Sequence, residues 1–273
     1  MIKKETKAYA KVNLTLDITG KAENGLHTLE SIMQTVSLFD RVTVFYDSKK
    51  PFSIDLSVFP ETDFPKEENL CYKAATAFAE DFGIASGEIN IFLEKNIPIK
   101  AGLGGGSSDC AAVLLLLAEI FGVEKKRLEK TAAALGSDVP FFLYGGNAKV
   151  SGTGNVTVPT GESPCFVFLL AKPEKGLSAA EVYKEFDRLG GKKTSFTEEK
   201  ELGNGLEEAV FSLCPECLCL CEKLKAAGAE KTLVSGSGTT VFGIFKTEKD
   251  AENAKKDIDK IFTAVCRAIN KEI

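Results

Sequence analysis

The feature that most constrains this chain is a glycine-rich segment that leads directly into an apolar run. Residues 98–109 read Pro-Ile-Lys-Ala-Gly-Leu-Gly-Gly-Gly-Ser-Ser-Asp, and the residues that follow, as far as Phe121, are mainly apolar. Because glycine has no Cβ atom, such a backbone reaches conformations closed to other residues and brings its N–H groups against a ligand. An apolar run without a polar face predicts a buried helix, whose first N–H groups lack partners within the helix. We therefore expect an anion cradle at residues 98–108.

A run of glycines is also typical of a flexible surface turn, and this alternative has to be weighed. Ser107, Ser108 and Asp109 favour the cradle, because they are good N-cap residues that would start the helix near Ser107. The segment is not a Walker A loop, since no Gly-Lys-Ser/Thr closes it, and it does not complete the dinucleotide fingerprint.

Composition and charge exclude several classes of protein. With 273 residues, 44% of them hydrophobic and 27% charged, the chain is typical of a globular protein with one large or two modest domains. A net charge of -5 argues against a protein that coats nucleic acid. Residues 1–12 lack the apolar core of a signal peptide, and the apolar run after Asp109 is too short to cross a bilayer. We expect neither export nor membrane insertion.

The chain has 8 cysteines, several of them clustered between residues 214 and 221. Without a secretion signal, we expect reduced thiols in a cytoplasmic protein. The first pair of the cluster has the spacing of zinc ligands, but no second pair follows at a suitable distance. Cys217, Leu220, Cys221 and Leu224 instead recur at helical spacing after Pro215, which favours one apolar helix face over the alternative of a metal site.

The hydrophobic pattern predicts a mixed chain of helices and strands. Strands are expected over residues 9–17, 31–38, 42–46, 52–58, 89–93, 165–171, 233–234 and 241–245, with an Asp-Arg turn at 40–41. Helices are expected over 70–82 after Asn69, over 178–187 after Ser178, in one long helix ending near 227, and over 248–260. We expect two domains, residues 1–160 and residues 161–273.

Three further features carry chemistry outside the glycine-rich segment. Lys11 lies within an otherwise apolar strand, Asp138 lies between a glycine turn and apolar residues, and residues 235–240 form a second turn of small residues. Each has a structural explanation by itself: a lysine at a strand edge, a helix N-cap, and a turn that joins two strands. Their combination therefore matters more than any one of them.

Taken together and in this order, the motifs resemble those of the GHMP kinase superfamily over nearly the whole chain. The segments that carry the resemblance are Ala-Lys-Val-Asn-Leu at 10–14, Gly-Leu-His at 25–27, residues 98–109, Gly-Ser-Asp-Val-Pro at 136–140, and residues 235–240. The first, the second and the Ser-Ser-Asp form of the third resemble a member that acts on a cytidine-diphosphate-linked polyol. The resemblance implies an α+β fold, with an N-terminal nucleotide-binding domain containing a left-handed βαβ unit and a ferredoxin-like C-terminal domain. The active site would lie between them.

The resemblance also implies an activity and its residues. A phosphoryl group would pass from ATP, with Mg²⁺, to the 2-hydroxyl of the polyol, in the non-mevalonate synthesis of isoprenoid precursors. Lys11 and Asp138 match the catalytic pair; Asn13, His27 and Tyr183 match residues that bind the substrate, with Tyr183 stacked on cytosine. The residues matching the ATP loop are Pro98, Ile99, Lys100, Ala101, Gly102, Leu103, Gly104, Gly105, Gly106, Ser107 and Ser108. Neither the metal ligands nor the oligomeric state can be predicted.

The residue types suit the implied chemistry. Asp138 would accept the proton of the attacking hydroxyl, and Lys11 would keep Asp138 ionised and stabilise the charge on the transferred group. The chain departs from the family at Leu26, where the family commonly has Tyr, and at Gly205, which follows Asn204 where the family has Asp. The first departure bears on the choice of substrate.

Two alternatives stay open. Another kinase of the superfamily would act on mevalonate, homoserine or a sugar, but such a substrate has no use for both Tyr183 and His27, the only histidine of the chain. A nucleotide-binding sensor without catalysis would not need both Lys11 and Asp138.

Overall fold

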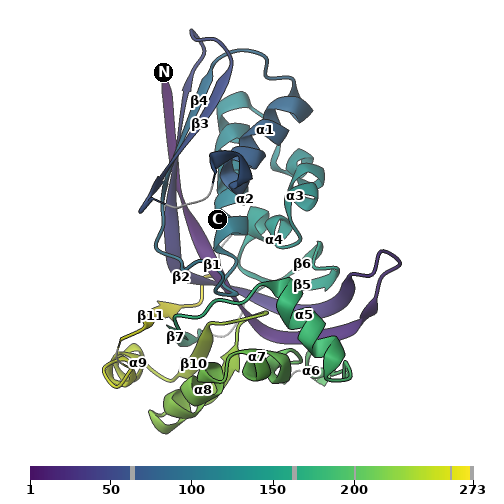
Figure 1. The fold of residues 1–273 in the computed structure, drawn as a ribbon. Helices are drawn as coiled ribbons and strands as arrows, with labels where there is room; N and C mark the ends of the chain where they lie inside the picture. Colours follow the sequence, from purple (N-terminus) through teal and green to yellow (C-terminus); the bar gives the residue numbers. More distant parts are fainter. Residues whose placement is uncertain (62–64, 162–164, 200, 259, 271–273) are drawn as a thin grey trace.

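The computed structural model describes residues 1–61, 65–161, 165–199, 201–258 and 260–270. Two sheets with their helices form the described part of the chain (Figure 1). The larger sheet has 7 strands: β1 (Ile2–Lys21), β2 (His27–Asp47), β3 (Ser53–Phe59), β4 (Glu88–Glu94), β5 (Asn147–Gly152), β6 (Val156–Gly161) and β8 (Gly203–Asn204).

A long hairpin is the frame of the larger sheet. β1 and β2 pair in antiparallel fashion along nearly their whole length, from Ile2 opposite Tyr46 to Lys21 opposite His27. One half of β2 also pairs with β4, and the other half pairs with β5. β3 lies parallel to β4 and is connected to it through η1 (Lys66–Glu68) and α1 (Leu70–Phe82), which forms a βαβ unit. The left-handedness expected for this unit stays a prediction.

The turn predicted at residues 40–41 is wrong, because β2 passes through these residues without a break. Asp40 is completely buried there. Its carboxylate accepts hydrogen bonds from the backbone N–H groups of Asn96 and Ile97 and from the Lys95 ammonium. A buried carboxylate is tolerated inside a strand when donors satisfy it in this way.

The helices of the first half cover one face of this sheet (Figure 1). They are α1, α2 (Gly105–Phe121), η2 (Lys125–Leu128), α3 (Glu129–Leu135) and α4 (Val139–Tyr144). The prediction of a buried helix is confirmed, since most of α2 from Ser108 to Ala118 is buried. Its predicted start near Ser107 is wrong by two residues: the helix begins at Gly105, and Gly104, with φ of 70°, is its N-cap.

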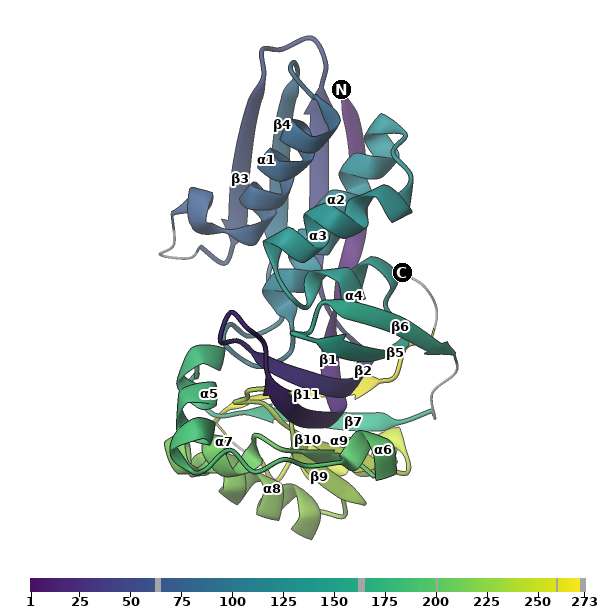
Figure 2. The same ribbon diagram turned by 90° about the vertical axis from the view of Figure 1, so that its right-hand side faces the viewer.

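The smaller sheet has the strand order β11-β7-β10-β9, and all its neighbours are antiparallel. Its strands are β7 (Val167–Lys172), β9 (Lys231–Val234), β10 (Val241–Phe245) and β11 (Phe262–Arg267). With α8 (Glu216–Ala226) and α9 (Glu248–Lys255) they follow each other as β-α-β-β-α-β, so the ferredoxin-like expectation is confirmed. Figure 2 shows α8 and α9 with the sheet, and α5 (Ala179–Arg188), α6 (Phe196–Glu199) and α7 (Glu207–Leu213) beside it.

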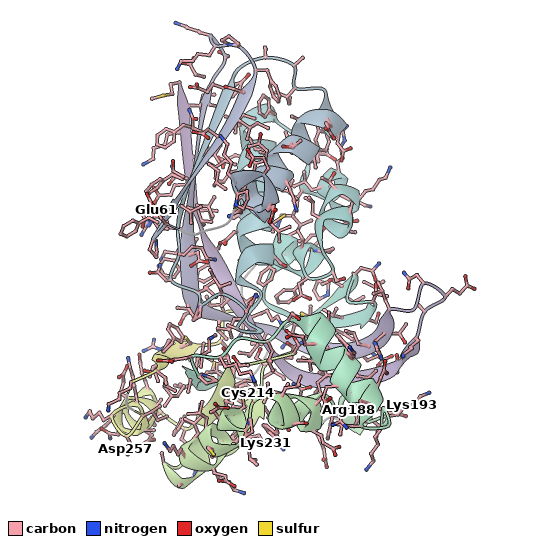
Figure 3. All side chains as sticks on the ribbon, in the orientation of Figure 1. Glu61, Arg188, Lys193, Cys214, Lys231 and Asp257 are labelled. Atoms are coloured by element: carbon pink, nitrogen blue, oxygen red, sulfur yellow. The ribbon has the colours of Figure 1, made fainter. Side chains whose placement is uncertain are left out.

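The long helix expected to end near residue 227 is two helices, α7 and α8, separated at Cys214 and Pro215 (Figure 3). Proline has no N–H group to continue a helix, so it stands at the start of α8 instead. Cys217, Leu220, Cys221 and Leu224 are the buried residues of α8, which confirms the predicted apolar face. The last helix is shorter than predicted, since α9 ends at Lys255.

The two sheets are connected by packing and by pairing. An apolar cluster between them includes Val12 and Leu14 of β1 and Phe168 and Phe242 of the smaller sheet. β8 pairs with β1 in parallel, and a bridge joins Val36 to Ala268. Within the described ranges, no helix is long and apolar enough to cross a membrane. The domain boundary near residue 160 stays a prediction.

Candidate active site

The glycine-rich loop between β4 and α2 is fixed from two sides. On one side, the backbone N–H of Lys11 in β1 donates to the carbonyl of Leu103 at 2.9 Å. On the other side, the turn between β9 and β10 contacts the loop: Ser235 Oγ donates to the Gly102 carbonyl at 2.9 Å. Gly102 has a φ of 72°, and a Cβ atom there would lie 2.1 Å from the Ser235 carbonyl oxygen. Only glycine permits this approach, so the two small-residue turns of the sequence form one structure.

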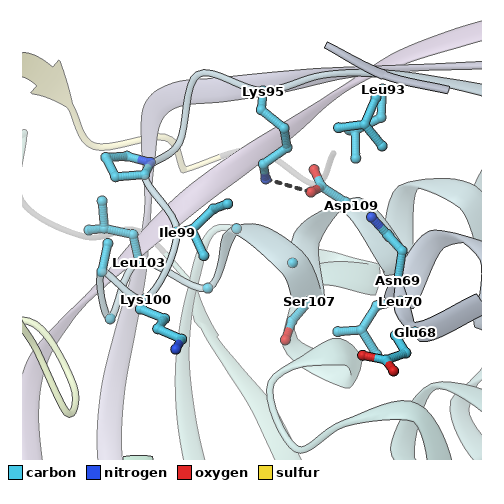
Figure 4. A pocket seen from close by; sticks show the side chains of 17 residues that line it. Glu68, Asn69, Leu70, Leu93, Lys95, Ile99, Lys100, Leu103, Ser107 and Asp109 are labelled. Atoms are coloured by element: carbon cyan, nitrogen blue, oxygen red, sulfur yellow. Dashed lines mark hydrogen bonds and ion pairs between the residues drawn. The ribbon is translucent and has the colours of Figure 1, made fainter. Parts of the chain in front are cut away.

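A cavity of about 520 Å³ opens in front of this loop (Figure 4). Such a volume is within the usual range for small-molecule sites. Ten of the residues predicted for the nucleotide line it: Pro98, Ile99, Lys100, Ala101, Gly102, Leu103, Gly104, Gly105, Gly106 and Ser107. Ser108 is buried in α2 and is not part of this lining. The wall is completed by Val58, Glu68, Asn69, Leu70, Leu93, Lys95 and Asp109, which the sequence did not assign to the nucleotide.

A buried charge cluster at the wall of this cavity was not predicted. Lys95 Nζ donates to Asp109 Oδ2 at 2.6 Å (Figure 4) and also to Asp40 Oδ2. The other oxygen of Asp109, Oδ1, is buried without a hydrogen-bond partner. Burial raises the pKa of Asp109 to about 7. Burial by itself would lower the pKa of Lys95. The negative charges of Asp109 and Asp40 outweigh this effect, so the pKa of Lys95 is raised. The predicted N-cap role of Asp109 is wrong, because its carboxylate pairs with Lys95.

The structure brings the two predicted catalytic side chains together. Lys11 Nζ lies 3.7 Å from Asp138 Oδ2, and Asp138 directly precedes α4. Lys11 is only 4% exposed. Burial lowers the pKa of Lys11, and the neighbouring Asp138 charge opposes this shift. Asp138 keeps 29% of its side chain exposed and is therefore open to a ligand.

Asn13 lies beside this pair and fixes the lysine. Lys11 Nζ donates to Asn13 Oδ1 at 2.6 Å, and Asn13 Nδ2 donates to Ser31 Oγ at 2.8 Å. Both glycine turns also come close: a Cβ atom at Gly236 would lie 3.2 Å from Lys11 Nζ, and one at Gly104 would lie 3.1 Å from Lys11 Cγ. The lysine thus lies where β1 and both turns meet.

Two of the predicted substrate residues, His27 and Tyr183, form an aromatic pair. The rings of His27 and Tyr183 are stacked, with centroids 4.7 Å apart and an angle of 17° between their planes. Burial raises the pKa of Tyr183 to about 12, and the charge of Asp138 makes a smaller contribution in the same direction. Leu26, at the position where the family commonly has Tyr, is 56% exposed.

Comparison with known proteins agrees with this geometry. The model of the GHMP kinases N-terminal domain matches residues 69–146, and that of the GHMP kinases C-terminal domain matches residues 184–264. The chain belongs to the GHMP kinase family, and it is a small-molecule kinase by that membership.

Within this family the chain is similar to enzymes named 4-diphosphocytidyl-2-C-methyl-D-erythritol kinase. It is 39% identical over 262 residues to that of Desulfitobacterium hafniense (strain Y51), covering 90% of this chain and 88% of the relative. It is 35% identical over 287 residues to that of Thermodesulfovibrio yellowstonii (strain ATCC 51303 / DSM 11347 / YP87), covering 96% and 97%.

Two solved structures also resemble the chain. A crystal structure of 4-(cytidine 5'-diphospho)-2C-methyl-D-erythritol kinase superposes with a TM-score of 0.81 at 32% identity, covering 97% of this chain and 99% of that one. Homoserine kinase from Cytophaga hutchinsonii, with a TM-score of 0.69 at 18% identity and coverage of 98% and 96%, shares the fold alone.

Proposed function

We propose that the protein transfers the γ-phosphoryl group of ATP to the 2-hydroxyl of 4-diphosphocytidyl-2-C-methyl-D-erythritol, in isoprenoid precursor synthesis. The names of the relatives support this substrate. The observation that carries the proposal is the buried Lys11, which lies beside Asp138 and next to both glycine turns. We assign residues 1–160 to ATP binding and residues 161–273 to completing the substrate site.

Different parts of the cavity suit the base and the phosphates of ATP. Val58, Leu70 and Leu93 provide apolar walls for the base, and Glu68 and Asn69 provide polar groups at its edge. The loop residues and the first residues of α2 line the same cavity, and their N–H groups suit the phosphates because they carry partial positive charge.

Mg²⁺ fits this site as a companion of the phosphates. In the part of the chain that the structure describes, no group of three His, Cys, Asp or Glu side chains forms a metal site. Mg²⁺ commonly keeps waters and substrate phosphates as ligands and takes only one or two from the protein. Ser107 lines the cavity at the loop and would supply a hydroxyl. When bound, the ion would neutralise charge on the phosphates.

The catalytic pair supports a proton transfer and an electrostatic role. Asp138 accepts the proton of the attacking hydroxyl, for which its partly exposed carboxylate is placed. Lys11 stabilises the carboxylate and the charge that develops on the transferred group. Asn13 keeps the ammonium in position through its side-chain oxygen, while its amide nitrogen donates to Ser31. We assign Tyr183 and His27 to the binding of the cytosine base.

We also propose a cytoplasmic location. All 8 cysteines are free in the structure, and free thiols are typical of a reducing compartment.

An acceptor panel tests the proposed function. Purified protein would be given ATP, Mg²⁺ and one of three acceptors: the cytidine-diphosphate-linked polyol, mevalonate or homoserine. ADP release and phosphorus NMR of the product would be measured. We expect efficient phosphorylation of the cytidine compound alone. Preference for mevalonate or homoserine would support another kinase of the family, and no ADP release with any acceptor would support a sensor.

A further inference from the structure

Lys11 and Asn13 lie on a part of β1 where the pairing of the sheet is irregular at both ends. The register between β1 and β2 shifts between Tyr9 and Lys11, and it shifts again between Asn13 and Thr15. Such irregularities re-aim side chains and are common beside active sites. In a strand interrupted in this way, side-chain contacts help to determine where Lys11 and Asn13 point.

Ser31 of β2, which belongs to none of the sequence motifs, continues a chain of hydrogen bonds that begins at Lys11. Lys11 Nζ donates to Asn13 Oδ1 at 2.6 Å, and Asn13 Nδ2 donates to Ser31 Oγ at 2.8 Å. Ser31 Oγ donates in turn to the backbone carbonyl of Thr15 at 2.5 Å. Ser31 is completely buried, and Asn13 is 1% exposed. The chain of hydrogen bonds is therefore buried and ends at a backbone atom.

The hydrogen bond to the backbone determines the direction of the others. A carbonyl oxygen only accepts, so the single hydrogen of the Ser31 hydroxyl is used for Thr15. The hydroxyl then accepts from Asn13, which turns the amide nitrogen toward Ser31 and the amide oxygen toward Lys11. An amide in the opposite orientation would present N–H groups to the ammonium, which only donates. Ser31 thus favours the amide orientation that supports the charge of Lys11.

We propose that Ser31 is a positioning residue for phosphoryl transfer: its hydroxyl orients the Asn13 amide, and the amide oxygen holds the Lys11 ammonium beside Asp138. Among the described residues, Asp138 is the charged partner of Lys11, at 3.7 Å, so the closer contact with Asn13 matters for the position of the ammonium. The role of the ammonium in turnover rests on the proposed function, whereas the effect of Ser31 on the ammonium does not.

Titration of Lys11 by NMR tests this arrangement without substrate. Burial lowers the pKa of Lys11, and the charge of Asp138 opposes that shift. Lysine labelled with ¹³C at Cε would report the titration, and the signal missing from Lys11→Met identifies the residue. In Ser31→Ala the amide loses the acceptor that orients it, so the pKa of Lys11 should fall further. Ser31→Cys, which keeps a side chain of similar size but is only a weak acceptor, should lower it in the same direction.

Two variants serve as matched controls. Ser31→Thr keeps the hydroxyl and should retain the pKa of the wild-type Lys11. Thr35 lies opposite Lys11 in β2, and its buried hydroxyl has no hydrogen-bond partner in the described part of the chain. Thr35→Val removes this hydroxyl without breaking a hydrogen bond and should also leave the titration unchanged. A Lys11 titration unchanged in both Ser31→Ala and Ser31→Cys, or changed equally in Ser31→Thr, would overturn the proposal.

Kinetics test whether the position of the ammonium matters for turnover. Ser31→Ala should lower kcat about 3- to 10-fold, the range that one hydrogen bond supplies, with KM for ATP nearly unchanged. The pH at which kcat/KM falls on the alkaline side should also move down, which a loss of folded protein alone would not cause. Ser31→Thr and Thr35→Val should keep both quantities. A shifted Lys11 titration with an unchanged kcat would remove Ser31 from the reaction. Absence of activity in every variant and in the wild type would instead contradict the proposed function, and the NMR result would still stand.

Discussion

At the scale of single residues, the site depends on a buried cation. Lys11 contacts Asn13 and Asp138, and its backbone N–H holds the glycine-rich loop through Leu103. A buried charge is costly unless it is paired, and among the described residues the ammonium has one carboxylate partner, at 3.7 Å. In the proposed mechanism, the transferred phosphoryl group supplies further compensation.

Removing the general base should stop turnover without weakening nucleotide binding. We expect Asp138→Asn to lower kcat by about 10²- to 10⁴-fold, because the attacking hydroxyl loses its proton acceptor. KM for ATP should stay within a few-fold, as measured in a coupled ADP assay. Glu80→Gln, at an exposed position of α1, serves as the control and should leave kcat unchanged. A kcat for Asp138→Asn close to that of the wild type would exclude Asp138 from the mechanism.

Activity should also depend on the proton of Lys11. Burial lowers the pKa of Lys11, so the ammonium loses its proton at a lower pH than the ordinary lysine value of about 10.4. If the charged form of Lys11 stabilises the transferred group, as proposed, kcat/KM should fall as pH rises, with an apparent pKa below that value. A pH–rate profile that stays level through about pH 10 would be incompatible with this role.

At the scale of elements, the two glycine turns support each other. Gly102 allows the loop of residues 98–104 to lie against the turn of residues 235–240, and Ser235 and Thr240 hydrogen-bond to its backbone. This contact joins the nucleotide cavity to the smaller sheet. The loop is therefore positioned by tertiary contacts and is more than a flexible connection.

A matched pair of alanine substitutions tests this contact. Gly102 and Gly122 have nearly the same φ, 72° and 68°, but a Cβ atom would collide with Ser235 only at Gly102. Gly122→Ala should cost about 1 kcal/mol of unfolding free energy, from backbone strain alone. Gly102→Ala should cost about 2–4 kcal/mol, because overpacking adds to the strain, and should raise KM for ATP. Equal losses in urea unfolding would show that the contact between the turns contributes nothing.

The elements also show what sequence reasoning can predict. The glycine-rich loop and α2 were predictable, because a local pattern determines them. The continuity of β2 was not, because Asp40 is satisfied by backbone N–H groups at Asn96 and Ile97, far along the chain. The same holds for Lys95, whose partners Asp40 and Asp109 lie in other elements. Lys11 and Asp138 could be predicted from sequence motifs. Asp40 and Lys95 could not, because their roles depend on contacts between residues that are distant in the sequence.

At the scale of the whole molecule, the site requires both halves of the chain. The larger sheet supplies Lys11 and the glycine-rich loop, and the later segments supply Tyr183 and the turn at 235–240. The pairing of β8 with β1 and the apolar cluster between the sheets hold these parts together. We infer that substitutions that disrupt the packing between the two sheets weaken the binding of ATP and of the phosphoryl acceptor together.

The charge cluster of Lys95, Asp40 and Asp109 should make global stability depend on pH. Burial raises the pKa of Asp109 to about 7, while that of an unfolded Asp is about 3.9. Between these values the folded state binds the extra proton, so its stability falls as pH rises. The unfolding free energy of the wild type minus that of Asp109→Asn should therefore decrease from about pH 5 to about pH 8, measured by urea unfolding without nucleotide. A difference that grows over this range would contradict the raised pKa.

A crystal structure with a non-hydrolysable ATP analogue and Mg²⁺ tests the central claim most directly. We predict the phosphates against the backbone N–H groups of residues 102–107, with the terminal phosphate facing the Lys11 and Asp138 side chains. An analogue bound instead in the separate cavity of about 550 Å³ between Pro173, Leu220 and Ile258 would contradict the account. So would phosphates that point away from Lys11.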